Sequence, residues 1–269
     1  MSEQENYRIG KFPKSRDLIV DAVSMSKYYQ HVVGFIDADV TKLLKIFNKY
    51  TEKTGEKLSL TAYVMRCMAI VASEIEETRT FRWRKRKTVV FDDVDIKCMI
   101  ERIVDGKKIP VHYMFRKVDK KSFKEIHNEL RYVQQKKMEK SSKDVRQKRR
   151  QKRIMSLPKF IRRIGWHFIM TNPFKTNKNL GVVGVTSLSK FSKGYQGLVL
   201  PKTMHQTHCL IGAISKKPVV IDDKIVIRDK MSLTLSFNHD VVDGGPSVQF
   251  IKRLTDVISD CVDLDEFDI

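Results

Sequence analysis

The sequence predicts a single α/β domain in which helices and a mixed β-sheet pack as a two-layer sandwich. Apolar residues recur at helical spacing in some segments and alternate with polar residues in others. The 269 residues are 41% hydrophobic, which is enough for one sizeable core. No internal repeat or low-complexity linker divides the chain, so we treat residues 1–269 as one domain.

Three segments in the first half are predicted to be helical. Residues 40–50 form the first helix, and a loop over 51–57 leads to a buried helix over 58–76, where apolar residues recur every three or four positions. Ser122 followed by Glu125 is a capping-box signature, which predicts a helix from there to about Lys140.

Alternating segments predict the strands, and turn dipeptides mark two of their connections. A hairpin is expected around Asp105-Gly106, and a short ribbon between Val219 and Ile227 is expected to turn at Asp222-Asp223. The remaining strand predictions are residues 88–104, 109–116, 181–188, 207–215 and 231–238.

The last of these strands leads into the most informative part of the chain. Leu233, Leu235 and Phe237 alternate with polar residues until His239, after which a polar turn closes on Asp243-Gly244. Pro246 then opens an amphipathic helix. A histidine at such a junction is held rigidly by the sheet yet can face a cleft, so His239 is a candidate general base.

Composition excludes several classes of protein. No segment approaches the roughly 18 apolar residues that a membrane span needs, and the polar N-terminus is not that of a signal peptide. The four cysteines are scattered without metal-ligand spacing, so we expect no disulfide and no metal site. Cys67 and Cys98 lie in apolar runs and are expected to pack as buried thiols. These features predict a cytoplasmic protein.

The net charge of +20 is concentrated in two segments. Residues 136–163 hold thirteen Lys and Arg and two acids, and residues 79–87 hold six Lys and Arg and no acid. Such segments attract an anionic partner such as nucleic acid, anionic lipid or a phosphorylated metabolite, but they are also typical of a solvated surface. Both interpretations stay open.

An amphipathic stripe lies inside the basic region. Its apolar members are spaced three or four residues apart, with arginines beside them. We expect this stripe to pack on its own domain, with an anionic membrane as the alternative. The members are Leu157, Phe160, Ile161, Ile164 and Phe168.

The run SFNHDVVDGGPSVQFIKRLTDVI resembles the last strand and helix of the catalytic domain of dihydrolipoyl acyltransferases from 2-oxoacid dehydrogenase complexes. Chloramphenicol acetyltransferase shares that fold and motif. The resemblance continues in KSRDLIVDAV, an opening segment with an arginine, and in LGVVGVTSLSKF, a strand with a hydroxyl residue. HDVVDG is closer to stand-alone members than to complex-bound ones, which have HRVVDG. Residues at about 136–180 have no counterpart and are interpreted as a basic elaboration.

The resemblance implies a chloramphenicol acetyltransferase-like fold and acyl transfer to or from coenzyme A. His239 would be the general base on an acceptor thiol or hydroxyl, and Thr186 would stabilise the tetrahedral oxyanion, with Ser187 as the alternative one residue away. Asp243 would pair with Arg16 and hold the histidine turn in shape. Gly244 would permit the backbone geometry behind it.

The resemblance also implies a homotrimer or larger assembly with sites at subunit interfaces, His239 of one subunit facing Thr186 of the next. No lipoyl domain precedes the core in this sequence, so we expect any lipoyl carrier to belong to another chain. The alternative is a non-catalytic assembly or anchoring protein of the same fold, whose basic segment binds RNA or a membrane.

Overall fold

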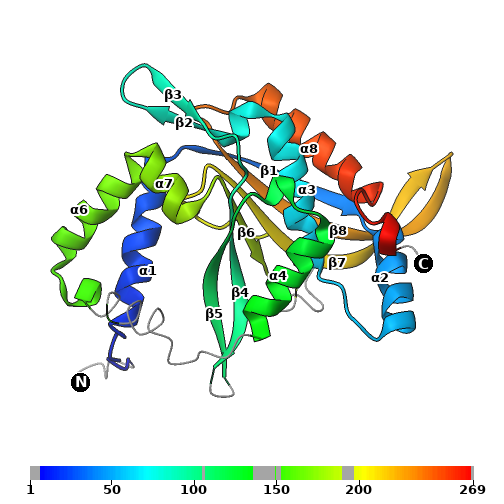
Figure 1. The fold of residues 1–269 in the computed structure, drawn as a ribbon, viewed down its shortest axis with the longest axis horizontal. Helices are drawn as coiled ribbons and strands as arrows, with labels where there is room; N and C mark the ends of the chain where they lie inside the picture. Colours follow the sequence, from blue (N-terminus) through cyan, green and yellow to red (C-terminus); the bar gives the residue numbers. More distant parts are fainter. Residues whose placement is uncertain (1–6, 105–106, 136–148, 150–152, 190–196, 268–269) are drawn as a thin grey trace, which may run out of the picture.

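The computed structural model describes residues 7–104, 107–135, 149, 153–189 and 197–267. Within these residues a six-stranded mixed sheet has the strand order β1-β8-β7-β6-β4-β5 (Figure 1). Neighbours β4, β6 and β7 run parallel, and the other neighbouring pairs are antiparallel. The strands are β1 (His31–Asp39), β4 (Ile96–Val104), β5 (Lys107–Phe115), β6 (Val183–Ser187), β7 (Thr207–Ile221) and β8 (Lys224–Asn238).

The helices confirm the predicted α/β sandwich. They are α1 (Ser15–Ser24), α2 (Thr41–Thr54), α3 (Leu60–Glu74), α4 (Phe123–Gln135), α6 (Lys159–Met170), α7 (Pro173–Leu180) and α8 (Gly244–Ser259), with short turns η1 (Met25–Tyr28), η2 (Glu76–Arg79), η3 (Val118–Lys120) and η4 (Asp265–Phe267). Helices α3, α4 and α8 pack on one face of the sheet, and α3 is buried along most of its length.

Local signals fixed several boundaries. The capping box at α4 is confirmed, because the Ser122 amide donates to the Glu125 carboxylate and the Glu125 amide donates to the Ser122 hydroxyl. The predicted loop at 51–57 begins later, since α2 continues to Thr54 and ends at Gly55 with a φ of 74°. The Asp105-Gly106 turn and the predicted end of α4 near Lys140 lie outside the described residues.

The single strand predicted over 88–104 is wrong. Residues 87–90 are β3 (Lys87–Val90), which pairs with β2 (Thr80–Trp83) in a separate ribbon, and only the second half joins the main sheet as β4. The break has a hydrogen-bonding cause: the Phe91 amide donates to the Arg79 carbonyl, and the Val94 amide donates to the Asp119 carboxylate. These backbone groups are therefore engaged with other segments.

Strands β7 and β8 form one long hairpin that includes the predicted ribbon. Its turn at Asp222 and Asp223 has positive φ at both residues, 49° and 58°, as a type I′ turn requires. The distal part of the hairpin projects beyond the ends of its neighbouring strands (Figure 1). Ile225 and Ile227 in this distal part are 78% and 69% exposed to solvent.

The two faces of the sheet differ in chemistry. On β8, Leu233, Leu235 and Phe237 point into the core beneath the helices, whereas Thr234 and Ser236 lie on the opposite face. This opposite face carries the polar groups of the candidate site. The four cysteines are buried free thiols, as predicted for Cys67 and Cys98.

The region at 136–180 contributes α6 and α7, and α6 lies beside α1 (Figure 1). The buried Asp21 and Arg162 side chains join them through an ion pair of 2.6 Å. Helix α6 turns the face with Arg162, Trp166 and Met170 toward its own domain. The predicted packing of the apolar stripe is therefore wrong. Its members Phe160, Ile164 and Phe168 are 64%, 51% and 58% exposed.

Candidate functional site

The turn that carries His239 is built by the last residue of β8. The Asn238 carbonyl accepts from the Val241 and Val242 amides, and its side chain accepts from the Asp240 amide. The His239 amide donates to the Gln30 carbonyl at 2.6 Å, which ties the turn to the segment before β1. Val242 is fully buried beneath it. The backbone around His239 is thus fixed on both sides.

The His239 ring itself is half-exposed. Its Nδ1 lies 3.6 Å from the Asp243 carboxylate, and the Asp243 side chain is 84% exposed. The structure therefore brings these two predicted residues together, four positions apart at the start of α8. The other ring nitrogen, Nε2, is the one suited to accept a substrate proton.

Two supporting roles expected from the resemblance are not found. An Asp243 carboxylate this exposed is not part of a buried pair with Arg16. Arg16 is exposed on α1 and lines a separate surface pocket, and the buried carboxylate of α1 is instead Asp21, paired with Arg162. Gly244 is an ordinary first residue of α8 without positive φ, and a Cβ there would meet no atom within 4 Å.

Thr186 lies on the polar face of the sheet, in β6. Its Oγ1 is 3.3 Å from Nε2 of His208. Burial, together with the nearby His31, lowers the pKa of His208 to about 4, so this imidazole is neutral at physiological pH. Ser187 alternates to the core-facing side and shares a hydrogen bond with Ser189. Of the two hydroxyls considered from the sequence, Thr186 is the one on the face opposite the helices.

A second histidine ring covers the same strand. The rings of His205 and His208 stack with centroids 5.8 Å apart, and the His31 Nε2 lies 3.0 Å from the His205 carbonyl. Burial and the neighbouring His208 lower the pKa of His205 well below its usual range. Gly184 makes room for this ring, since a Cβ there would lie 2.3 Å from it. His205 and His208 therefore both lie beside β6, next to Thr186 and Gly184.

Within one chain, Thr186 and His239 do not meet. The pairing registers place Thr186 level with Leu210 on β7 and Thr234 on β8. His239 lies five residues beyond Thr234 along the chain, and β8 is two strands away from β6. At ordinary strand dimensions the backbones of Thr186 and His239 are therefore about 15–20 Å apart. Any site that uses both side chains requires two subunits.

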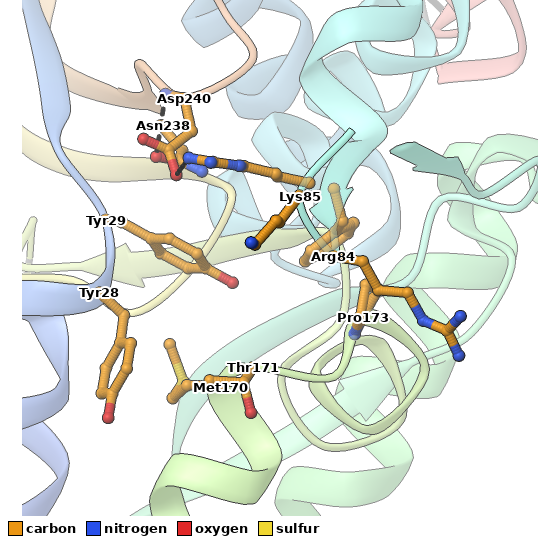
Figure 2. Close-up of a pocket in the computed structure, with 11 residues that line it drawn as sticks. Tyr28, Tyr29, Arg84, Lys85, Met170, Thr171, Pro173, Asn238 and Asp240 are labelled. Carbon is orange, nitrogen blue, oxygen red and sulfur yellow. Dashed lines mark hydrogen bonds and ion pairs between the residues drawn. The ribbon is translucent and has the colours of Figure 1, made fainter. Parts of the chain in front are cut away.

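A cavity of about 440 Å³ adjoins the His239 turn. Asn238 and Asp240 form one end of it, and Lys85 extends toward Tyr29 from the opposite wall (Figure 2). The wall opposite the tyrosines belongs to the β2–β3 ribbon, which contributes Phe81, Arg82, Arg84 and Lys85, while α6 and α7 contribute Met170 and Pro173.

The charges of this cavity are unbalanced. Of the described residues that line it, three are cations and one is an acid, Asp240, which lies 3.8 Å from the Arg82 guanidinium. Burial raises the pKa of Tyr29 to about 12, so this phenol stays protonated. The basic run was visible in the sequence, but Tyr28 and Tyr29 were missed as site residues, since no local pattern places them opposite the ribbon. The cavity suits an anionic ligand with an aromatic or apolar part.

Among the described residues no group of three His, Cys, Asp or Glu side chains is placed to hold a metal ion. No helix in the same part of the chain is long and apolar enough to cross a membrane.

Comparison with known proteins places the chain in a family. The sequence profile described as 2-oxoacid dehydrogenases acyltransferase (catalytic domain) matches residues 4–149 and 201–264, most of the chain. The match includes His239 and Asp243, whereas Thr186 falls in the unmatched interval.

The curated relatives are acyltransferase components of dehydrogenase complexes. The acetyltransferase component of the pyruvate dehydrogenase complex from Rickettsia bellii is 23% identical over 92% of this chain and 51% of its own length. The corresponding Rickettsia typhi protein is 24% identical over 93% of this chain and 54% of its own length. The chain thus spans about half the length of these relatives.

Solved structures share the fold. The cubic core of a pyruvate dehydrogenase multienzyme complex has a TM-score of 0.68 at 17% identity and covers 97% of this chain and 96% of its own. A probable dihydrolipoamide acetyltransferase from Listeria monocytogenes has a TM-score of 0.66 at 19% identity and covers 95% of each chain. These matches confirm the predicted fold, and the chain belongs to the family of 2-oxoacid dehydrogenase acyltransferase catalytic domains.

Proposed function

We propose that this chain is a coenzyme A-dependent acyltransferase in which His239 is the general base. The observation that carries the proposal is the His239 turn: a half-exposed imidazole on a backbone fixed from both sides, with Nδ1 facing a carboxylate. A solved structure of Azotobacter vinelandii dihydrolipoamide acetyltransferase concerns the role of a serine, a histidine and an asparagine in its catalytic mechanism. That protein is 18% identical to this chain, with a TM-score of 0.65, and the match covers 97% of this chain and 96% of its own. Its histidine and asparagine are four residues apart, as His239 and Asp243 are here.

The reaction needs a deprotonated acceptor. A free thiol has a pKa near 8.5, so an imidazole that takes its proton raises the fraction of reactive thiolate at neutral pH. The thiolate attacks the carbonyl carbon of the acyl thioester and forms a tetrahedral oxyanion. Collapse of this oxyanion expels the second thiolate, which takes the proton back from His239. In this scheme Asp243 orients the ring and does not itself carry the proton.

The oxyanion needs a hydrogen-bond donor, and we assign this role to Thr186. If the neutral His208 donates its Nε2 proton to Thr186 Oγ1, the threonine proton is free to point away from the sheet. His208 is then a positioning residue. Because Thr186 and His239 of one chain are too far apart, the assigned active site lies between subunits, which supports a homotrimer or larger homo-oligomer.

Replacing Thr186 tests the oxyanion role. Thr186→Val keeps the shape of the side chain and removes the donor, so kcat should fall by about 10²–10³-fold. Thr186→Ser should retain most of the activity. Ser187→Ala is the matched control on the opposite face and should remain near wild type. A large loss in Ser187→Ala with none in Thr186→Val would transfer the role to Ser187.

The cavity beside the His239 turn is assigned to the phosphates of coenzyme A. Arg84 and Lys85 are exposed cations on its rim, while Arg82 is partly neutralised by Asp240. Charge-assisted hydrogen bonds to phosphate contribute about 1.5–3 kcal/mol each, and their loss weakens binding more than chemistry.

The ribbon offers its own control for this assignment. Arg84→Ala/Lys85→Ala should raise KM for acyl-CoA by at least about tenfold, and more at low salt, with little change in kcat. Arg86→Ala/Lys87→Ala removes two cations of the same ribbon that do not line the cavity. Equal effects of the two double variants would show only a general electrostatic attraction, and would contradict the assignment.

A further inference from the structure

Helix α6 presents an apolar face to solvent. Phe160, Ile164 and Phe168 are spaced by one helical turn and are 64%, 51% and 58% exposed, and Ile161 beside them is 39% exposed. The opposite side of α6 is anchored by the buried Arg162–Asp21 ion pair and by Met170. The helix is therefore docked on its domain in an orientation that leaves these four apolar side chains exposed.

The surroundings of this face are cationic. Between Asp144 and Asp222 the sequence contains no Asp or Glu, whereas Lys and Arg occur throughout. Lys159 and Arg163 are exposed on α6, and Nζ of Lys175 lies 5.6 Å above the Phe168 ring. The neighbouring helix α1 continues the pattern, with a pocket that has Ile19, Val20 and Val23 among Arg16, Lys27 and Lys202.

We propose that α6 docks the protein on an anionic lipid bilayer. Aliphatic and phenylalanine side chains between cations fit the boundary between acyl chains and negatively charged headgroups. A second copy docked face to face through α6 would set its exposed Lys159 and Arg163 against the same two cations. A nucleic acid would engage the cations but would leave Ile161 and Ile164 in water. The bilayer is the partner that satisfies both features.

Vesicle sedimentation of the 269-residue chain tests this proposal. Binding is expected to vesicles of phosphatidylcholine mixed with phosphatidylserine, and much less to phosphatidylcholine alone. Ile164→Ser/Phe168→Ser should weaken the partition coefficient by at least about 100-fold, since each side chain loses its burial in the bilayer. Lys159→Gln/Arg163→Gln should weaken it by about tenfold or more, with most of this effect lost at high salt.

The β7–β8 hairpin supplies the matched control. Ile225→Ser/Ile227→Ser removes two side chains that are even more exposed, at the far side of the molecule from α6 (Figure 1). This variant should bind vesicles like the wild type. All variants change exposed positions and should keep the wild-type melting temperature.

Three outcomes would overturn the proposal. One is wild-type vesicle binding by Ile164→Ser/Phe168→Ser. Another is binding that salt abolishes completely and that single-stranded RNA displaces, which would leave only a cationic nucleic-acid surface. The third is a wild-type oligomer in sedimentation velocity that this variant dissociates, which would make the face a contact between copies.

Discussion

His239→Ala is expected to lower kcat for acyl transfer by at least about 10²-fold, because a positioned general base contributes about 10²–10⁴. The fold should survive, since the ring is half-exposed and the backbone hydrogen bond to Gln30 is kept by alanine. Steady-state kinetics with acyl-CoA and a dithiol acceptor measures the loss. Added imidazole should restore part of the activity, because it can enter the space of the missing ring.

Asp243→Asn separates the two residues of the turn. The amide keeps the size of the side chain and can present an oxygen to Nδ1 of His239, so the expected loss is smaller than about tenfold. A loss as large as that of His239→Ala would mean that the Asp243 charge is required for the proton transfer.

A folded His239→Ala protein with full activity would contradict the proposed mechanism.

The largest expected effect on stability comes from the Asp21–Arg162 pair. Both side chains are nearly buried, at 1% and 8% exposure, so removing one partner leaves an uncompensated charge in the interface between α1 and α6. Arg162→Ala should lower the free energy of unfolding by about 3–5 kcal/mol, and the double variant with Asp21→Ala should cost less than the sum of the two single variants.

The bidentate Arg253–Glu74 pair between α8 and α3 is the control. Both of its side chains are exposed, at 46% and 39%, so Arg253→Ala should cost no more than about 1 kcal/mol. Chemical denaturation of the four variants gives the comparison. Equal costs for Arg162→Ala and Arg253→Ala, or full additivity for Asp21 and Arg162, would contradict the buried pair.

Features with a local cause were predictable from the sequence. The capping box of α4, the turn at Asp222-Asp223 and the strand that ends at His239 each depend on residues close in the chain. The alternation in β8 also gave the right core face. Such signals require only backbone hydrogen bonding and the period of the side chains.

Features that depend on distant segments were not predictable in this way. The break between β3 and β4 is fixed by Arg79 and Asp119, which lie outside the predicted strand. The stripe on α6 identified the apolar face, but periodicity alone does not say whether that face meets the protein or the solvent. An arginine–aspartate pair does tie down the N-terminal helix, but its members are Asp21 and Arg162, 141 positions apart.

Acyl transfer by the purified protein is the most direct test of the proposed mechanism. Acyl-CoA and dihydrolipoamide are incubated with wild type or His239→Ala, and S-acyl dihydrolipoamide and free coenzyme A are quantified by mass spectrometry. Equimolar products are expected, formed by the wild type at a rate that saturates with acyl-CoA and by the variant at a rate at least about 10²-fold lower. The assay is repeated with short-chain acyl donors and with dithiol and hydroxyl acceptors. If the wild type, the variant and buffer alone form equal amounts of product in every case, the proposed mechanism is contradicted and the chain is a non-catalytic member of the family.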